Sequence, residues 1–514
     1  MNSTEGKNAG RREDPVASFE HDRPFRVIIA GGGVAGLAMA HALLRAGIDH
    51  VVLEKGDVAP DWGASISTWG HGSRILSQIG CLEALEAAAL PLKLLHTRGT
   101  DGKAFSQEPF FDMMKERNGF ECITMERRTF LRIVYDRLPD KSKVLTGKRV
   151  IDVEETDDGV LVKLQDGTIE QGDILIGCDG VHSRVRDLMW RNANLAVENR
   201  ITSEEKRSQI VTYKSLVGVS WAVPGLGIRD MHWVCERGLS FLILTQPDKI
   251  YFFVNWKLPR KMRWPSKAKW SNEEAEAAAQ SVAEIPISDS AVFGELWKNK
   301  IRGHLIGLEE GMFEHWYNGR IALVGDSVHK VTPNFALGAM CALESTAVLL
   351  NKIVAVHKTL EPGERPSKTE IGNLFHSYQE ERKPRMQIAL DASAFITRLQ
   401  AYDGNLMHFM MRVMFPIPGQ ARYANQLAEF VSGSPKFDFL PVAYTLPATY
   451  GWKDESTPIN TTKKKQWKIG SSVTDVTVTE MISLALLTLL FFTVFGARVE
   501  NSVPVPVTFN ISSL

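Results

Sequence analysis

The 514-residue chain is poor in cysteine, and its five cysteines lie far apart. It has no C-x-x-C pair and no cluster of cysteine with histidine, so the sequence predicts neither a disulfide scaffold nor a metal site. Few cysteines without a pairing pattern are typical of a catalytic region that faces a reducing compartment such as the cytosol. The five positions are Cys81, Cys122, Cys178, Cys235 and Cys341.

An excess of charge of either sign is also lacking, because Lys+Arg and Asp+Glu both number 60. Such a balance gives no general attraction to nucleic acid, and no nucleic-acid partner is expected. Residues 1–24 have no apolar core segment, which excludes a secretory signal peptide. Their polar, charged composition predicts a disordered N-terminal segment.

Long hydrophobic runs are absent until the C-terminus, where Met481–Ala497 carries no charge. We predict one transmembrane helix over 476–497 and a short tail over 498–514. Four lysines precede the run and Arg498 follows it, so the positive-inside rule predicts a single-pass membrane protein whose catalytic region faces the cytosol, most simply at the endoplasmic reticulum. The alternative is a buried C-terminal helix that docks on the rest of the protein.

What the sequence does contain is a nucleotide-binding signature near its beginning. The apolar segment Arg26–Ala30 predicts a buried strand, which leads into a G-x-G-x-x-G motif formed by Gly31, Gly33 and Gly36. These glycines allow a tight turn, a close approach of backbone to a pyrophosphate, and close packing of helix on strand. A second apolar strand ends in Glu54, which is placed to accept hydrogen bonds from a ribose. The motif alone does not separate FAD from NAD.

Two later segments repeat the pattern of an apolar strand followed by a turn with a carboxylate. One leads into Asp179-Gly180 and the basic residues Arg184 and Arg186, and the other into Gly325-Asp326. Both predict ligand-binding turns at the carboxyl edge of a parallel sheet.

With these three motifs in this order, the chain resembles the flavoprotein monooxygenases of the para-hydroxybenzoate-hydroxylase type over residues 25–398. The resemblance implies FAD as cofactor, with Glu54 on the adenosine ribose and Asp326 on the ribityl chain. It also assigns Arg127 to the cofactor, with Arg128 as the rival for that place, and Asp179 to the second motif. NAD(P)H is implied as co-substrate, docking transiently near Arg184 and Arg186.

A closer resemblance is to fungal monooxygenases that epoxidise prenyl chains in meroterpenoid and indole-diterpene pathways. It rests on residues 63–66, 325–334 and 434–441, and it gives Ser67 a flavin contact. It implies a prenylated small-molecule substrate, O2, a flavin hydroperoxide as the oxygen donor, and a membrane terpene cyclase as a partner in the same pathway.

The loop after Gly325-Asp326 departs from the family pattern P-x-x-G-Q-G-x-N. Gly338 and Glu344 match, whereas Ala336 stands where the family has glycine. The family places this loop, with Gly338 and Ala339, against the flavin ring through backbone amides. We expect alanine to be tolerated if its φ is negative and to be costly if its φ is positive.

The expected fold is α/β: a Rossmann-type FAD-binding domain over 25–196 and 301–398, with a mixed β-sheet substrate domain over 197–300. A helical C-terminal region follows, since periodicity predicts helix over Leu374–Phe415. The C-terminal wrap and linker occupy 399–475, with extended chain expected over 416–470. Six aromatic residues of the substrate domain line a pocket or belong to the core: Trp221, Trp233, Phe241, Phe252, Phe253 and Trp256.

Two single residues carry open alternatives. Tyr213 is the candidate catalytic residue, because relatives place a tyrosine facing the flavin here; ordinary strand packing is the alternative. His329 is expected to satisfy backbone at a helix start rather than to donate a proton.

The leading prediction is therefore an FAD-dependent epoxidase. An aromatic-ring hydroxylase, a reductase or oxidase, and a non-enzymatic flavin-binding partner of a membrane complex are the alternatives.

Overall fold

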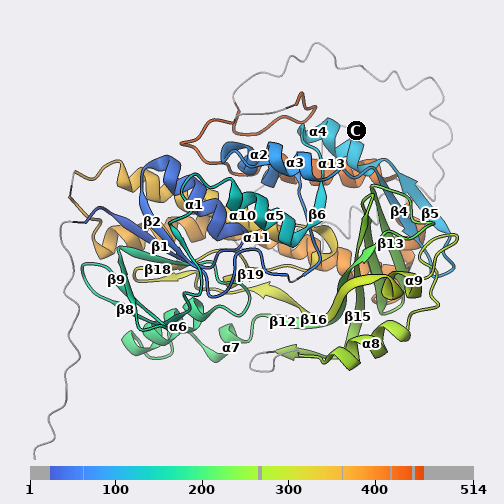
Figure 1. Ribbon diagram of the computed structural model, residues 1–514, viewed down its shortest axis with the longest axis horizontal. Helices are drawn as coiled ribbons and strands as arrows, with labels where there is room; N and C mark the ends of the chain where they lie inside the picture. The colour runs from blue at the N-terminus through green and yellow to red at the C-terminus, as the bar shows by residue number, and fades with distance from the viewer. Residues whose placement is uncertain are drawn as a thin grey trace, which may run out of the picture. The chain divides into compact units, whose positions relative to one another are not determined.

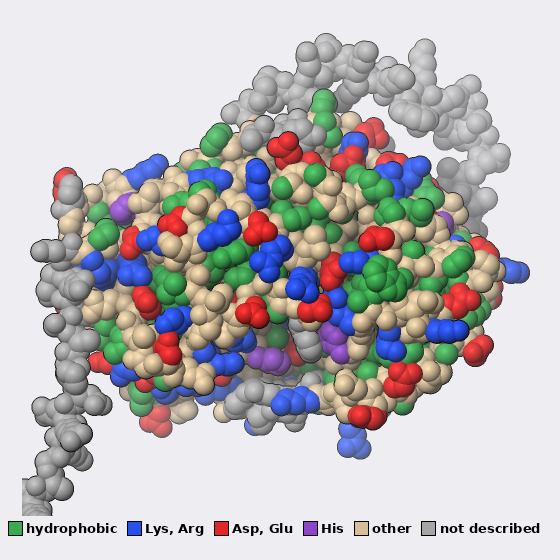
Figure 2. Space-filling model, in the orientation of Figure 1, with side chains coloured by type: hydrophobic (Ala, Val, Ile, Leu, Met, Phe, Trp, Pro, Cys, Tyr) green, Lys and Arg blue, Asp and Glu red, His purple; other side chains and the backbone are tan. Residues whose placement is uncertain are grey.

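A computed structural model describes residues 23–455, except for residues 62, 264–268, 362, 417–418 and 443–445. Almost all of the predicted N-terminal segment, the predicted transmembrane helix 476–497 and the tail 498–514 lie outside the described residues. Acidic and basic side chains are interspersed over the face drawn in Figure 2, in line with the balanced composition.

The nucleotide-binding half is a six-stranded sheet in the order β17-β18-β11-β1-β2-β7. Its central strands are parallel and their apolar runs are buried, as expected of a parallel sheet that is covered on both faces. The strands are β1 (Arg26–Ala30), β2 (Asp49–Leu53), β7 (Val144–Leu145), β11 (Ile174–Gly177), β17 (Tyr317–Asn318) and β18 (Ile321–Leu323). This confirms a Rossmann-type sheet built from two distant parts of the chain.

The helix α1 (Val34–Ala46) packs on this sheet, α10 (Gly338–His357) packs on α1, and α11 (Lys368–Gln400) packs on α10. Among the described residues, α10 is the helix long and apolar enough to cross a membrane, but 72% of it is buried inside the protein. It packs against α1, α2 (Gly70–Gln78) and α11, so it is a core helix.

The second half is an eight-stranded sheet in the order β19-β16-β12-β15-β14-β13-β4-β5 (Figure 1). It extends beyond the predicted 197–300 boundary, because long-range pairing recruits strands from both flanking segments of the chain. Its strands are β4 (Leu94–Arg98), β5 (Ala104–Glu108), β12 (Ile210–Trp221), β13 (Asp230–Glu236), β14 (Leu239–Thr245), β15 (Lys249–Arg263), β16 (Lys300–Met312) and β19 (His329–Lys330).

Helices α8 (Asn272–Gln280) and α9 (Phe293–Lys298) cover one face of this sheet. Phe241 and Phe252 pack there against Phe293, so these members of the aromatic set belong to the core. Trp221 is 56% exposed and lines no core at all.

The predicted hairpins are confirmed as a three-stranded sheet of β8 (Val150–Glu155), β9 (Val160–Leu164) and β10 (Ile169–Gly172). The remaining short elements connect the two halves. They are β3 (Ser65–Ser67), α3 (Leu82–Ala88), α4 (Phe110–Asn118), β6 (Thr124–Glu126), α5 (Arg127–Asp136), α6 (Arg184–Ala196), α7 (Ser203–Lys206) and the 3-10 turns η1 (Gly325–Ser327) and η2 (Pro333–Phe335).

The helical prediction through Phe415 is confirmed by α12 (Asn405–Phe409) and a π-helical turn η3 (Met410–Met414). The extended wrap predicted from 416 is wrong in its first part, where α13 (Gly419–Ser432) forms. In α13 the buried residues Ala424, Leu427, Ala428 and Val431 follow the spacing of one helix face. Between α13 and Glu455, the described residues run without regular structure.

The end of this irregular segment is fixed by Arg74 of α2, a fully buried cation. Arg74 pairs with Asp454 at 2.9 Å and Glu455 at 2.8 Å, and its guanidinium lies 4.3 Å from the ring centre of Trp452. A buried cation needs such partners, so this contact holds residues 452–455 on the first half of the chain.

Candidate active site

In the glycine-rich turn between β1 and α1, each of three glycines has a different steric environment. Gly31 has φ +110°, and a Cβ there would lie 2.4 Å from the Cys178 carbonyl oxygen. A Cβ on Gly36 would lie 1.9 Å from the Gly31 carbonyl oxygen. A Cβ on Gly33 would meet no atom within 4 Å, so Gly33 faces open space at the start of α1. This is the arrangement that a pyrophosphate requires.

That open space belongs to a cleft of about 430 Å³. It is lined by Gly31 and Gly33 and by residues at the ends of β2 and β11. Glu54 lines the cleft while its carboxylate accepts hydrogen bonds from the backbone N–H groups of Gly32 (2.7 Å) and Gly56 (2.9 Å). The carboxylate is therefore held at the cleft, and its contact with a ribose stays a prediction. The nucleotide end of FAD fits this donor and acceptor set.

Between the two candidate arginines, the structure selects Arg127. Arg127 begins α5 and lines the cleft, where burial lowers the pKa of its guanidinium against the opposing effect of Asp326 and Glu54. Arg128 points away, is 51% exposed, and lies 3.9 Å from Asp61.

Asp179 also lines the cleft, but its carboxylate mainly fixes the start of α6. It accepts hydrogen bonds from the backbone N–H groups of Arg184 (2.7 Å) and Val185 (3.0 Å) and from the Ser183 hydroxyl. Burial raises the pKa of Asp179. The predicted ligand turn is thus present, with Gly180 and the backbone as the groups nearest the cleft.

The side chains of the two arginines of α6 lie in different surroundings. Arg184 is exposed at the cleft and remains a candidate for binding NAD(P)H. Arg186 is buried: it donates to the carbonyl oxygens of Ser327 and Val181 and lies over the rings of Trp190 and Phe313. The prediction that Arg186 contacts NAD(P)H is wrong, because its helix position turns it into the protein.

Asp326 lies in the turn η1, outside the residues that line the nucleotide cleft. It forms an ion pair with Lys330, a partner that the sequence analysis did not identify. Burial alone would lower the pKa of Lys330, but the Asp326 carboxylate outweighs burial and raises it. Asp326 also acts on Arg127 electrostatically, so the two predicted cofactor residues share one region.

The loop after η1 adopts the costly conformation. Ala336 has φ +52° and ψ +29°, a left-handed conformation that favours glycine. The loop is held on two sides: Trp69 Nε1 donates to the Phe335 carbonyl oxygen at 3.1 Å, and Asn334 Nδ2 donates to Gln400 Oε1 at 2.6 Å. These tertiary contacts hold the strained residue in place.

After the loop, Gly338 and Ala339 are half-buried and begin α10, whose N-terminal N–H groups are free to face a ligand. Glu344 of α10 is fully buried, and its carboxylate lies 2.7 Å from Arg382 and 2.7 Å from Arg385 of α11. These ion pairs anchor α10 to α11. Burial would raise the pKa of Glu344, but the two arginines outweigh it and lower the pKa to about 2.

His329 does not satisfy backbone at a helix start, because it lies in β19 and its Nε2 is 2.9 Å from the Ser345 hydroxyl. Burial, with the nearby Arg382, lowers the pKa of His329 to about 3. The imidazole is therefore neutral and serves the same buried network as Glu344.

Tyr213 is fully buried on β12 and packs against Leu308 and Ala401. Its hydroxyl donates to Asp403 Oδ2 at 3.0 Å, and Lys257 donates to the other oxygen of that carboxylate. Burial and the carboxylate raise the pKa of Tyr213, so the phenol stays protonated. Sequence reasoning missed Asp403, which follows α11 and lies far from Tyr213 along the chain. The catalytic role of Tyr213 stays a prediction.

Ser67 is buried at the end of β3, where its hydroxyl donates to the Thr124 hydroxyl at 2.9 Å. Because the Ser67 hydroxyl already has this partner, a flavin contact would be made by the backbone atoms of Ser67. That contact stays a prediction. Next to it, Trp69 stacks on Phe111 and meets the ring of Phe335 at 6.1 Å. With Phe110 these rings form an aromatic wall beside the strained loop.

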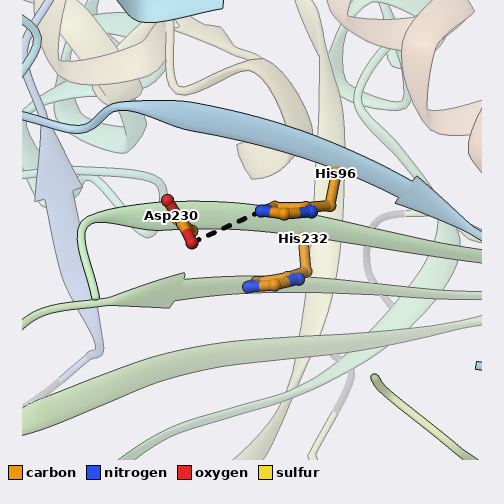
Figure 3. Close-up of side chains that lie close together, drawn as sticks. All are labelled: His96, Asp230 and His232. Carbon is orange, nitrogen blue, oxygen red and sulfur yellow. Dashed lines mark ion pairs between the residues drawn. The ribbon is translucent and has the colours of Figure 1, made fainter. Parts of the chain in front are cut away.

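One set of side chains has ligand atoms close enough for a metal among the described residues: His96, Asp230 and His232 (Figure 3). His232 has no lone pair to give, since its Nε2 lies 2.7 Å from the Leu226 carbonyl oxygen and its Nδ1 accepts from Arg98 Nε at 3.4 Å. The guanidinium of Arg98 also disfavours a cation. The set is better described as a buried hydrogen-bonding cluster, in which burial lowers the pKa of His232 to about 3.

Comparison with known proteins agrees with this geometry. A family model described as an FAD binding domain matches residues 25–393. The chain is 40% identical over 422 residues to the FAD-dependent monooxygenase DEP2 of Alternaria brassicicola, which covers 81% of this chain and 79% of the relative. It is 35% identical to the FAD-dependent monooxygenase penE of Penicillium thymicola, over 83% of this chain and 90% of the relative.

Solved structures show the same fold at lower identity. Klebsiella pneumoniae HpxO complexed with FAD and uric acid aligns with a TM-score of 0.64 and 21% identity, covering 79% of this chain and 96% of that one. The tetracycline destructase Tet(51) aligns with a TM-score of 0.56 and 14% identity, covering 79% of this chain and 98% of that one.

Proposed function

The chain belongs to the family of FAD-dependent monooxygenases, and on that premise we propose that it epoxidises an olefin of a prenyl side chain, using NAD(P)H and O2. The product would be prepared for cyclisation in the biosynthesis of a fungal meroterpenoid or diterpenoid. Bound FAD supplies the activation of O2, which no amino-acid side chain provides. The rest of the proposal concerns what the residues of this chain do.

The observation that carries the proposal is the aromatic wall of Trp69, Phe110, Phe111 and Phe335 beside the loop at Ala336. Trp69, Phe110 and Phe111 are buried, which keeps water away from the loop, and Phe335 is the half-buried ring of the wall. Such a dry, apolar border suits a hydrocarbon chain next to the loop. The carbonyl of Phe335 is already bound to Trp69, so the wall and the loop are one unit.

A phenol hydroxylase would instead need a base close to its substrate. Tyr213 cannot serve as one at neutral pH, because Asp403 and burial keep its phenol protonated. This favours an alkene over a phenol as the reacting group. We assign Tyr213 a positioning role through Asp403, in place of proton transfer.

The cleft itself is assigned to the nucleotide end of FAD, so NAD(P)H is proposed to dock transiently at its rim, where the side chains of Arg184 and Arg149 are exposed. Phosphate groups favour such arginines. Replacing Arg184 with alanine is expected to raise KM for NAD(P)H with little change in FAD content, whereas Arg186→Ala should destabilise the protein.

The membrane association of this enzyme is part of the proposal and rests on the apolar run 481–497. A lipid-soluble prenyl substrate, and a terpene cyclase that receives the product, would both be reached from the membrane. We propose a cytosolic catalytic region at the endoplasmic reticulum.

The test is turnover under 18O2 with membranes that contain the whole chain, NADPH, and a panel of prenylated phenols, pyrones and indoles. One 18O atom in a prenyl epoxide or its diol is the expected result. An 18O atom on an aromatic ring would instead identify a ring hydroxylase. NADPH oxidation without 18O in any product would identify an oxidase or reductase, and no oxidation in the FAD-loaded protein would identify a non-enzymatic flavin protein. The Asp326→Ala variant serves as the FAD-poor control.

A further inference from the structure

The segment formed by α12 and η3 (Asn405–Met414) presents apolar side chains to solvent. Leu406 is 50% exposed, Phe409 48% and Val413 42%. Their spacing of three and four residues places them on one face of the helix. The opposite face is fixed in the protein by the buried side chains of Met410, Met411 and Met414. The exposed apolar face is therefore fixed in position, and none of the described residues buries it.

Within the segment itself the polar residues beside this face are neutral or basic, while Asp101 lies near Arg412 from another part of the chain. His408 and Arg412 are exposed, and the guanidinium of Arg412 lies 4.5 Å from the ring centre of Phe105. From Gly404 to Ala428 the sequence contains no Asp or Glu. The acid just before this stretch, Asp403, is neutralised by Lys257.

An apolar stripe next to a basic, acid-free stripe is the pattern of a helix that lies in a membrane interface. Three half-exposed side chains are too small an area for a stable protein–protein interface, which requires on the order of 800 Å² per partner. Shallow insertion among lipid headgroups needs no more than such a stripe, and anionic headgroups complement Arg412.

We propose that the face formed by Leu406, Phe409 and Val413 inserts into the interfacial region of an anionic lipid bilayer. The inference deepens the membrane association within the proposed function, but it rests on residues 404–428 and not on the run 481–497. The two can therefore fail separately.

Docking at this face would orient the enzyme. Asp403, which binds the Tyr213 hydroxyl, immediately precedes the helix, and the Ala401 carbonyl oxygen accepts from the backbone N–H of Gly238 in the turn between β13 and β14. The end of the substrate sheet that carries Tyr213 would then lie near the lipid, on the side from which a hydrocarbon substrate arrives.

The test uses the whole chain on vesicles of phosphatidylcholine with phosphatidylserine. A spin label is attached at Phe409→Cys and, separately, at Val413→Cys in case one position perturbs packing. Accessibility to O2 is compared with accessibility to a water-soluble nickel chelate. Leu195→Cys is the matched control, because Leu195 is 78% exposed on the nucleotide-binding half. Unmutated protein gives the background from the native cysteines.

We expect the labels at 409 and 413 to become accessible to O2 and protected from nickel on vesicles, whereas the label at 195 stays accessible to nickel. Labels at 409 and 413 that remain as accessible to nickel as the label at 195, on protein that is bound to vesicles, would overturn the inference and leave the 481–497 anchor standing. Failure of the chain to bind vesicles would overturn both. Protection already present without vesicles would assign the face to a protein contact and overturn the lipid proposal. The 18O2 assay is independent of all four results.

Discussion

The two ends of the predicted FAD site are built in different ways. At the nucleotide end, Gly36 and Glu54 meet backbone atoms of residues 31–56, so most of the site follows from a short stretch of sequence, although Gly31 also lies against the backbone of Cys178. At the flavin end, the loop around Ala336 is held by Trp69 and Gln400, which lie far away along the chain. A local rule governs the first end, and tertiary contacts govern the second.

The difference teaches where a family pattern can change. A side chain at Gly36 has nowhere to go, because the atom it would strike is backbone. Alanine at 336 costs about 1–2 kcal/mol through its left-handed φ, and a well-packed loop can tolerate that cost. Single substitutions at the nucleotide end should therefore cause loss of FAD or of folding, whereas single substitutions at the flavin end should be partly tolerated.

The largest effect is expected at the nucleotide end. Gly36→Val places two methyl groups where even a Cβ would lie 1.9 Å from the Gly31 carbonyl oxygen, so β1 and α1 must separate. We expect loss of FAD together with a large drop in Tm, measured by flavin absorbance and thermal melts. Gly33→Ala is the matched control: its Cβ meets no protein atom, so the variant should fold normally and lose FAD affinity only. Equal Tm losses in the two variants would refute the division of roles.

The second-largest effect is expected at the buried ion pairs that support the flavin end. Glu344→Gln leaves Arg382 and Arg385 without their buried carboxylate, and the expected loss is about 3–5 kcal/mol in the free energy of unfolding at pH 7. The folded-state pKa of Glu344, about 2, is below its ordinary 4.5, so the stabilisation is present above pH 4.5 and is lost as the pH falls toward 2.

The pH dependence gives a readout that simple damage would not. Urea unfolding of the two proteins at pH 7 and at pH 4 should show that the gap between unmutated protein and Glu344→Gln narrows at the lower pH. A gap that stays constant would mean that the carboxylate is not ionised against the arginines in the folded protein.

A smaller effect is expected at the carboxylate that follows β18. Asp326→Ala removes a charged acceptor from the predicted ribityl site, and a hydrogen bond to a charged group contributes about 1.5–3 kcal/mol. FAD affinity should therefore fall by roughly 10- to 100-fold. Full flavin occupancy at low FAD concentration would contradict the ribityl role. Lys330→Ala separates the loss of the ion pair from the loss of the acceptor, and it should retain more FAD.

The smallest effect sharpens the comparison at the strained residue itself. Ala336→Gly relieves the left-handed conformation but makes the unfolded chain more flexible, so the net change should stay within about 1 kcal/mol. Ala336→Val, a β-branched residue at φ +52°, should destabilise more and loosen the flavin. Thermal melts and the flavin absorbance spectrum distinguish the two. Identical behaviour of Gly and Val would show that the loop relaxes out of the left-handed region.

Some features could be read from sequence because they depend on neighbours in the chain. The glycine turn, the placement of Glu54 at the end of β2, and the choice of Arg127 over Arg128 follow from strand and helix periodicity, which fixes where each side chain points. The course of α11 through 374–400 was predicted on the same ground.

Other features depended on pairings that no local pattern encodes. Arg186 was expected in the ligand site, yet its place on α6 directs it onto Trp190 and Phe313. The eight-stranded sheet takes β4 and β16 from outside the predicted segment, because strand pairing joins distant residues.

The sequence by itself determined most of the nucleotide-binding end, because the contact with the Gly31 carbonyl oxygen, within one short turn, leaves glycine no substitute at 36. Only the tertiary structure decided the sign of φ at Ala336 and the partner of Tyr213. Both depend on residues brought together by the packing of α11 against the loop and the substrate sheet, namely Gln400 and Asp403. Contacts of that range are energetic consequences of the whole fold, so no short motif carries them.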